Sequence, residues 1–277
     1  MPIPNDGATI SNNGFGLHFR SWEAPEPKAD VVLVHGYSEH CGRYGHVANY
    51  LNNRGYSMRS LDFPGHGHSP GLRGYADRMD DYVEAIHALI QETKAVSGRT
   101  KVFLLGHSMG GLIAALVGLK YQQDLAGIVL TAPALKVDHL ASPFVIAMGK
   151  LLSQYTPRLG VAPPVDPSWI SRDPAVVESY RTDPLIYRGK IRARPGYEII
   201  LGSRYFSANA SHLTLPLLVL QGGADRVIPR SGVDLVFPAI GSKDKTIHIF
   251  PDFYHEILQE PEKLEVLQII NDWFDNH

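Results

Sequence analysis

The chain has 277 residues, of which 44% are hydrophobic and 19% are charged, and its formal net charge is -2. This length suits one large α/β domain with an insertion, and a core of that size is stabilised by burial without a metal or a disulfide framework. The near-neutral charge, without a basic stripe, excludes an extended nucleic-acid surface. The single cysteine, Cys41, excludes an intrachain disulfide.

The start of the chain carries no targeting pattern. Residues 1–7 lack a basic segment followed by an apolar run, so we expect no secretory signal. No stretch approaches the roughly 20 apolar residues that cross a bilayer. We therefore expect a cytoplasmic protein whose contact with membranes or lipid droplets is at most peripheral.

Short apolar runs alternate with amphipathic helical stretches along most of the chain, which is typical of a mostly parallel sheet with helices on both faces. Asn12-Asn13-Gly14 predicts the turn of an opening hairpin. A strand buried on both faces need not alternate apolar and polar residues, so the apolar runs predict strands. These runs are residues 31–34, 56–61, 101–105, 127–130, 216–220 and 246–250. Helical patterns cover residues 82–96, 112–121 and 261–274.

Residues 134–213 interrupt this alternation. The segment is rich in proline and contains no run that predicts a strand convincingly. We interpret it as an inserted helical lid over the carboxyl edge of the sheet, where open α/β sheets bind ligands. Residues 1–133 and 214–277 then form the core. The most apolar piece of the lid segment, residues 143–152, predicts a helix that packs inward, walls a pocket, or does both.

A glycine-flanked serine follows the third predicted strand. Gly106-His107-Ser108-Met109-Gly110 fits the pattern G-x-S-x-G, and a helical stretch follows it directly, as in a nucleophile elbow. Glycine at both ends relieves the crowding of so tight a turn. The glycine spacing and the absence of a following lysine exclude a dinucleotide fingerprint and a P-loop. We therefore predict Ser108 as a nucleophile rather than a structural serine.

A nucleophilic serine needs a base and an acid, which on this fold follow it in the order acid, then histidine. Asp225 lies just beyond the strand at 216–220, and His255 is the only histidine in the loop after the last predicted strand. Asp252 is a rival acid, but it shares a tight loop with His255, so we favour Asp225. His255 would take the proton of Ser108 during attack on an ester carbonyl, and Asp225 would orient the imidazole.

The turn after the first predicted strand, at His35-Gly36-Tyr37, predicts an oxyanion hole. Such a turn supplies one backbone N–H, and the residue after the nucleophile supplies the second, which assigns the amides of Tyr37 and Met109. His35 itself is expected to be structural.

Two histidines at His66-Gly67-His68 invite a metal site, because H-x-H can bind zinc. No further ligands follow in the sequence. We therefore expect a structural loop and neither a metal nor a cofactor.

Together these motifs resemble the monoacylglycerol lipase family of serine hydrolases. The predicted catalytic residues are 117 and 30 positions apart along the chain, which is similar to the family. The matching pieces are HGYSEH at 35–40 with GRY at 42–44, DFPGHGHS at 62–69, GHSMGG at 106–111, GADRVIP at 223–229 and YHE at 254–256.

The resemblance implies an α/β-hydrolase fold with a lid, and cleavage of a monoacylglycerol to glycerol and a fatty acid through an acyl-enzyme. It implies that Glu39 and Arg43 help to hold the glycerol head group, although the same pair equally predicts an ion pair at the start of the next helix. The apolar lid would contact membranes, with Lys150 reaching toward lipid head groups.

Two departures from the family affect the neighbourhood of the oxyanion hole and the head-group region. Tyr37 stands where the family often has a small residue, and Leu258 stands where some members have a second histidine. The head-group contacts are therefore less well defined than the triad.

There are two alternative functions, of which the first stays open. A lysophospholipase or a general carboxylesterase would use the same triad and differ only in head-group selection. A non-catalytic binding module is disfavoured, because all three triad residues are present. The sequence predicts a lipid ester substrate and no nucleic-acid partner, and it leaves the oligomeric state open.

Overall fold

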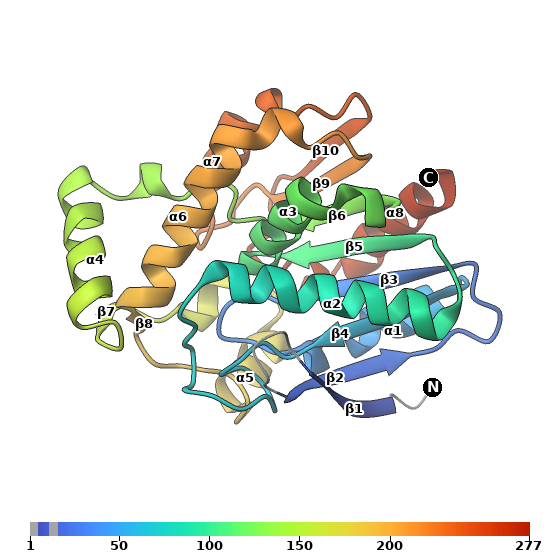
Figure 1. The fold of residues 1–277 in the computed structure, drawn as a ribbon, viewed down its shortest axis with the longest axis horizontal. Helices are drawn as coiled ribbons and strands as arrows, with labels where there is room; N and C mark the ends of the chain where they lie inside the picture. The colour runs from blue at the N-terminus through green and yellow to red at the C-terminus, as the bar shows by residue number, and fades with distance from the viewer. Residues whose placement is uncertain (1–4, 11–15) are drawn as a thin grey trace.

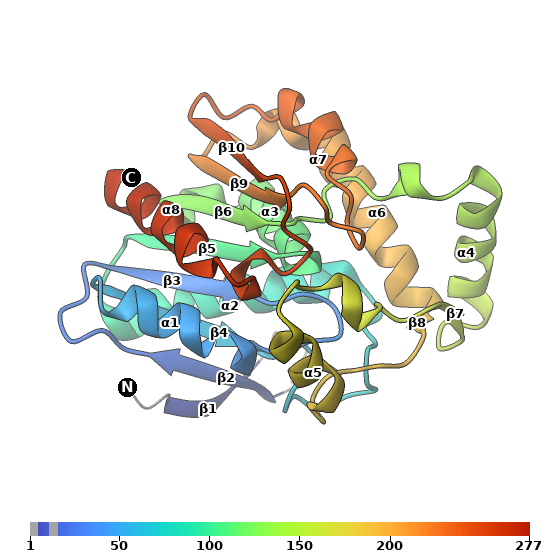
Figure 2. The same ribbon diagram turned by 180° about the vertical axis from the view of Figure 1, so that it is seen from behind.

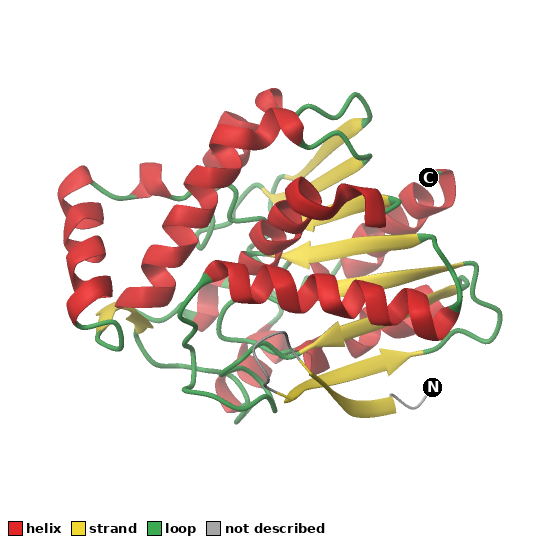
Figure 3. Cartoon of the chain, in the orientation of Figure 1, coloured by secondary structure: helices red, strands yellow, loops and turns green. Residues whose placement is uncertain are grey.

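A computed structural model describes residues 5–10 and 16–277. Its centre is an eight-stranded sheet in the order β1-β2-β4-β3-β5-β6-β9-β10 (Figures 1 and 3). The first two strands, β1 (Asn5–Ile10) and β2 (Gly16–Trp22), pair antiparallel with each other, and β2 pairs antiparallel with β4. All other neighbours are parallel. The predicted hairpin turn at 12–14 lies outside the described residues.

The six predicted strands are all present. Every residue of the strands from β3 to β6, and of β9, is buried, which explains why their sequences do not alternate. Of the six predicted strands, β10 alone is half-buried, and it lies at the edge of the sheet. The bounds are β3 (Ala29–Val34), β4 (Tyr56–Leu61), β5 (Val102–His107), β6 (Gly127–Thr131), β9 (Leu217–Gly222) and β10 (Lys245–Phe250).

Helices cover both faces of the sheet (Figures 1 and 2). One face packs against α2 (Met79–Ser97), α3 (Met109–Tyr121) and the short α7 (Ser231–Val236). The other face packs against α1 (Gly45–Asn52) and α8 (Lys263–Asn276). The three helices predicted by pattern correspond to α2, α3 and α8. The α/β-hydrolase fold predicted from the sequence is confirmed.

Between β6 and β9 the chain leaves the sheet and forms three helices. They are α4 (Pro143–Tyr155), α5 (Pro174–Thr182) and α6 (Ala193–Asn209). The expectation that this segment holds no strand is wrong, because β7 (Gly160–Ala162) and β8 (Ile191–Arg192) form a small antiparallel pair. Strands of three and two residues are too short to appear as apolar runs in the sequence.

The first of these helices, α4, begins where the sequence predicts. Ser142 caps it by accepting a hydrogen bond from the N–H of Val145, and Pro143 occupies the first helical turn. Both views place α4 at the edge of the molecule, against α6 and away from the sheet (Figures 1 and 2). In the described part of the chain, no helix combines the length and apolarity needed to cross a bilayer.

Candidate active site

Ser108 occupies the sharp turn between β5 and α3. Its backbone has a φ of 55°, a left-handed value that is rare for a residue with a side chain. The turn leaves no room at the flanking glycines: a Cβ on Gly106 would lie 2.4 Å from the carbonyl oxygen of Gly110, and a Cβ on Gly110 would lie 2.2 Å from that of Val34. The strand–turn–helix geometry expected of a nucleophile elbow is present.

The structure brings the three predicted triad residues together. The Nε2 of His255 lies 2.9 Å from the Oγ of Ser108, and its Nδ1 lies 2.8 Å from the Oδ2 of Asp225. The parallel strands explain this meeting, because Ser108, Asp225 and His255 each follow the carboxyl end of a strand. The imidazole thus bridges a hydroxyl and a carboxylate.

The carboxylate of Asp225 is held by three further donors. Its Oδ1 accepts the backbone N–H groups of Val227 and Ile228, at 2.8 and 2.9 Å. Its Oδ2 also accepts a hydrogen bond from the side-chain amide of Gln221, at 3.0 Å. Sequence reasoning missed Gln221, because a polar residue at the end of a buried strand has no visible partner until the chain folds.

The surroundings of His255 favour its protonated form. Burial alone would lower the pKa of His255, but the charge and hydrogen bond of Asp225 and the charges of Glu256 and Glu39 outweigh burial and raise it. The neighbouring His107, whose ring centre is 4.8 Å away, behaves in the opposite way. Burial and the proximity of His255 lower the pKa of His107 to about 4. Of the two imidazoles, that of His255 contacts both the Ser108 hydroxyl and the Asp225 carboxylate.

A cavity of about 160 Å³ opens beside Ser108. Tyr37 and Met109, the predicted oxyanion-hole residues, both line it. The side chain of Tyr37 points to another contact, because its hydroxyl donates to the carbonyl of Gly74 at 2.8 Å. The segment between β6 and β9 contributes apolar side chains to the cavity wall, namely Val165, Ile170, Tyr180, Ile191 and Ile199.

A larger groove, of about 620 Å³, lies between α2, α3 and α6. Its floor is apolar, with residues such as Leu116 and Leu201, and its rim carries Asp80, Lys120 and Glu198. None of the predicted catalytic side chains lines it, so the chemistry assigns the smaller cavity as the candidate site.

Glu39 and Arg43 form a buried ion pair, as one of the two sequence interpretations predicts. The Nη1 of Arg43 lies 2.9 Å from the Oε2 of Glu39. Arg43 also donates two hydrogen bonds, at 2.6 and 2.7 Å, to the carboxylate of Glu256, the residue after the predicted base. Sequence reasoning gave Glu256 no role, although its place beside His255 is a signal. In the described part of the chain, the cavity wall includes Glu39 and Glu256 but not Arg43.

The rival residues lie elsewhere. Asp252 is exposed and is not the carboxylate bonded to His255. His35 is fully buried, donates from Nδ1 to the carbonyl of Gly36 and accepts the N–H of Phe63 at Nε2. It has the structural place expected of it.

His66 is buried and His68 is exposed, so the two histidines of the H-x-H pattern do not face a common point.

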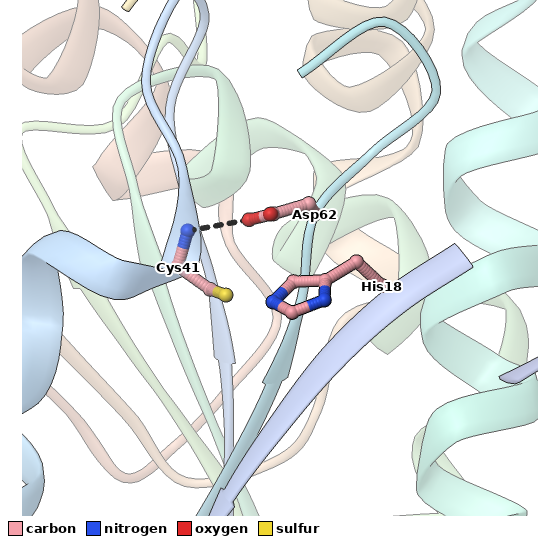
Figure 4. A group of neighbouring side chains, drawn as sticks. All are labelled: His18, Cys41 and Asp62. Carbon is pink, nitrogen blue, oxygen red and sulfur yellow. Dashed lines mark hydrogen bonds between the residues drawn. The ribbon is translucent and has the colours of Figure 1, made fainter. Parts of the chain in front are cut away.

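One group of side chains has the composition of a metal site. Among the described residues, His18, Cys41 and Asp62 place one potential ligand atom each within 4.8 Å of one another (Figure 4). The two carboxylate oxygens of Asp62 are already engaged, since they accept the backbone N–H groups of Cys41 and His68 at 2.8 Å. The hydrogen bond from the N–H of Cys41 ties the turn after β4 to the loop after β3.

Comparison with known proteins agrees with this geometry. The sequence model of the serine aminopeptidase S33 family matches residues 25–262. A monoacylglycerol lipase of Mycolicibacterium smegmatis is 35% identical over 252 residues, which cover 91% of this chain and 90% of the relative. A phospholipase of Bacillus subtilis is 30% identical over 261 residues, covering 93% and 99%.

A solved structure shows the same relationship in three dimensions. The crystal structure of the monoacylglycerol lipase of Paleococcus ferrophilus superposes with a TM-score of 0.85 at 35% identity, covering 94% of this chain and 99% of the other. The chain is therefore a serine hydrolase that belongs to the monoacylglycerol lipase family of the α/β-hydrolase fold.

Proposed function

We propose that the chain hydrolyses monoacylglycerols to glycerol and a fatty acid, with Ser108 as nucleophile, His255 as general base and Asp225 as the orienting acid. The observation that carries the proposal is the continuous chain of contacts from the Asp225 carboxylate through the His255 imidazole to the Ser108 hydroxyl, at 2.8 and 2.9 Å. Ser108 and His255 line a cavity with an apolar lid wall, which offers a surface for the acyl chain.

The reaction proceeds in two stages. The Oγ of Ser108 attacks the ester carbonyl while Nε2 of His255 takes the hydroxyl proton. The backbone N–H groups of Tyr37 and Met109 stabilise the oxyanion, and each such donor contributes about 3 kcal/mol to catalysis. The imidazolium then gives its proton to the departing glycerol oxygen, which leaves an acyl-enzyme. Water deprotonated by His255 attacks this ester, and the proton returns to Ser108 as the fatty acid leaves.

The two ends of the substrate meet different surfaces. The apolar lid residues around Ile170 and Ile199 suit the acyl chain, because burying each methylene contributes about 0.8 kcal/mol. Glu39 also lines the cavity, and its carboxylate is the acceptor that we propose for a hydroxyl group of the glycerol head. Arg43, which does not line the cavity, donates a hydrogen bond to this carboxylate.

We also propose that the exposed face of α4 contacts the lipid surface that supplies the substrate. Phe144 and Tyr155 are 74% and 70% exposed, and Met148 and Leu151 continue the same helical stripe. Lys150, the only charged residue of α4, suits a contact with lipid head groups. This face fits reversible binding to membranes or lipid droplets from the cytoplasm.

A substrate panel on purified protein tests the main proposal. We expect fatty acid release from monoacylglycerols that greatly exceeds release from triacylglycerols, and loss of this release in Ser108→Ala. The Bacillus relative named as a phospholipase favours lysophospholipids as the second candidate. A faster rate on lysophosphatidylcholine than on monoacylglycerol, with the same dependence on Ser108, would move the assignment to that class. Full activity in Ser108→Ala would refute the nucleophile.

A further inference from the structure

Arg43 lies at the centre of a buried cluster that joins three separate parts of the chain. Its guanidinium contacts Glu39, in the turn that follows β3, and Glu256, in the loop that carries His255. These side chains are 9%, 4% and 7% exposed. The ring of Tyr180, from α5 in the lid segment, lies over the guanidinium at 5.2 Å. The contacts therefore come from the oxyanion turn, the histidine loop and the lid segment.

Each arm of the cluster reaches the reacting groups within one or two residues. The Oε1 of Glu39 accepts the N–H of Gly36, at 2.6 Å, next to the predicted oxyanion donor Tyr37. Glu256 is bonded to His255 through the chain itself, and its own N–H donates to the carbonyl of Ile170 in the lid segment, at 2.7 Å.

A second contact fastens the same two segments. The side-chain amide of Gln259 donates to the carbonyl of Arg43, at 3.0 Å. The histidine loop therefore contacts both the main chain and the side chain of Arg43.

From this geometry we propose that Arg43 and Glu256 are positioning residues, which lock the loop of His255 against the oxyanion turn, instead of binding the glycerol head group. The proposal rests on the triad of the proposed function and assigns two residues that act on it indirectly. A bidentate arginine–carboxylate pair suits this task, because its planar geometry fixes orientation as well as distance. Small displacements of catalytic groups are costly, with about 1 Å corresponding to a loss of about 10²-fold in rate.

The cluster also affects the charge around the base. Two carboxylates share one guanidinium, which leaves one net negative charge close to His255. Among the described residues, the charged groups with the largest effect on His255 are Asp225, Glu256 and Glu39, while the ring of His107 packs beside it and the guanidinium of Arg43 bonds to both glutamates. Removing the charge of Glu256 should therefore favour neutral imidazole and move the acidic limb of the pH–rate profile to lower pH.

Two variants test the proposal on two substrates. Glu256→Gln keeps the size of the side chain and removes its charge, while Arg43→Lys keeps the charge and loses the two-pronged contact. We expect kcat to fall by about 10- to 100-fold with KM changed by less than about twofold, equally for a monoacylglycerol and for p-nitrophenyl butyrate, which has no glycerol. For Glu256→Gln we also expect the shift of the acidic limb.

A matched control is available at the opposite end of the sheet. Arg99 makes the same two-pronged contact, at 2.7 and 2.9 Å, with the buried Asp30 near the start of β3. Arg99→Lys should lower the melting temperature without changing kcat or the pH profile.

The other outcomes each exclude the positioning role. A rise in KM for the monoacylglycerol alone, with normal turnover of p-nitrophenyl butyrate, would show that these residues serve head-group binding, directly or through Glu39, and not the position of His255. A lower melting temperature with unchanged kcat would show a purely structural pair. If Arg43→Lys does not fold, Glu256→Gln decides the matter, because Arg43 keeps Glu39 as its partner. Failure of the triad itself is detected separately by Ser108→Ala.

Discussion

At the scale of single residues, the site depends on how one imidazole is surrounded. His255 is buried, yet its pKa lies above the ordinary histidine value, because the negative charges of Asp225, Glu256 and Glu39 outweigh the loss of solvation. The fixed carboxylates are thus arranged for the imidazolium that forms when Ser108 loses its proton. The same arrangement makes the resting base easier to protonate.

This environment predicts the pH dependence of activity. His255 accepts a proton only when it is neutral, so activity must fall as acidification protonates it. Since its pKa is raised, kcat/KM should reach half its maximum above pH ~6.5, the value of a free histidine. The measurement is kcat/KM for a soluble ester across this range at constant ionic strength. A profile that stays flat well below that pH would contradict the role of His255.

Sequence reasoning predicted each of the three triad residues individually, and the structure brings them within hydrogen-bonding distance of one another. Short motifs beside predicted strands were enough, because parallel strands bring their carboxyl ends to one edge. The partners of these residues were harder to predict. Gln221 lies four positions from Asp225, whereas Glu256 lies 213 positions from Arg43, and no local pattern shows which side chain either of them will contact.

At the scale of elements, the turn between β5 and α3 shows how closely the backbone approaches itself. A Cβ at Gly110 would meet the carbonyl oxygens of Val34 and His35 at 2.2 and 2.4 Å. These atoms belong to the backbone of the neighbouring strand end, so they cannot swing away as a flexible side chain would. The strand–turn–helix unit therefore requires glycine here on steric grounds.

Substitution at this glycine should be costly to folding. We expect Gly110→Ala to lower the free energy of unfolding by about 3 kcal/mol, as overpacking of a rigid site does. Gly45→Ala is the control, because Gly45 has helical angles, φ −56° and ψ −34°, and open space around its Cβ position. That variant should be neutral or about 0.4–1 kcal/mol more stable. Urea unfolding compares the two, and equal stabilities would refute the steric argument.

The elements differ in how visible they are in the sequence. Strands such as β5 and β9 are runs of large apolar residues, since both faces are covered, and they could be predicted from composition alone. The pair of β7 and β8 could not, because three and two residues carry no period and the two strands are far apart in the sequence. The division into a core and a lid at residues 134 and 213 stays an interpretation.

At the scale of the whole molecule, the exposed apolar surface is uneven. The face of α4 shows Phe144, Val145 and Tyr155 to solvent, and this helix lies at the edge of the molecule beyond α6 (Figures 1 and 2). Only Ile146 and Ser153 of α4 are buried. A helix that contributes so little to the core and exposes so many large apolar groups suits contact with an external apolar surface. The lipid phase that contains a lipid ester substrate is such a surface.

This asymmetry predicts that the molecule binds lipid in one orientation. We expect Phe144→Ser combined with Tyr155→Ser to weaken cosedimentation with phosphatidylcholine vesicles by about tenfold or more, because each large apolar side chain contributes on the order of 1.5 kcal/mol when buried. Turnover of dissolved p-nitrophenyl butyrate should stay unchanged, since neither residue lines the catalytic cavity. Leu264→Ser is the control, because Leu264 is 64% exposed but lies on α8, which covers the sheet. Equal losses in both variants would mean that vesicle binding does not select the α4 face.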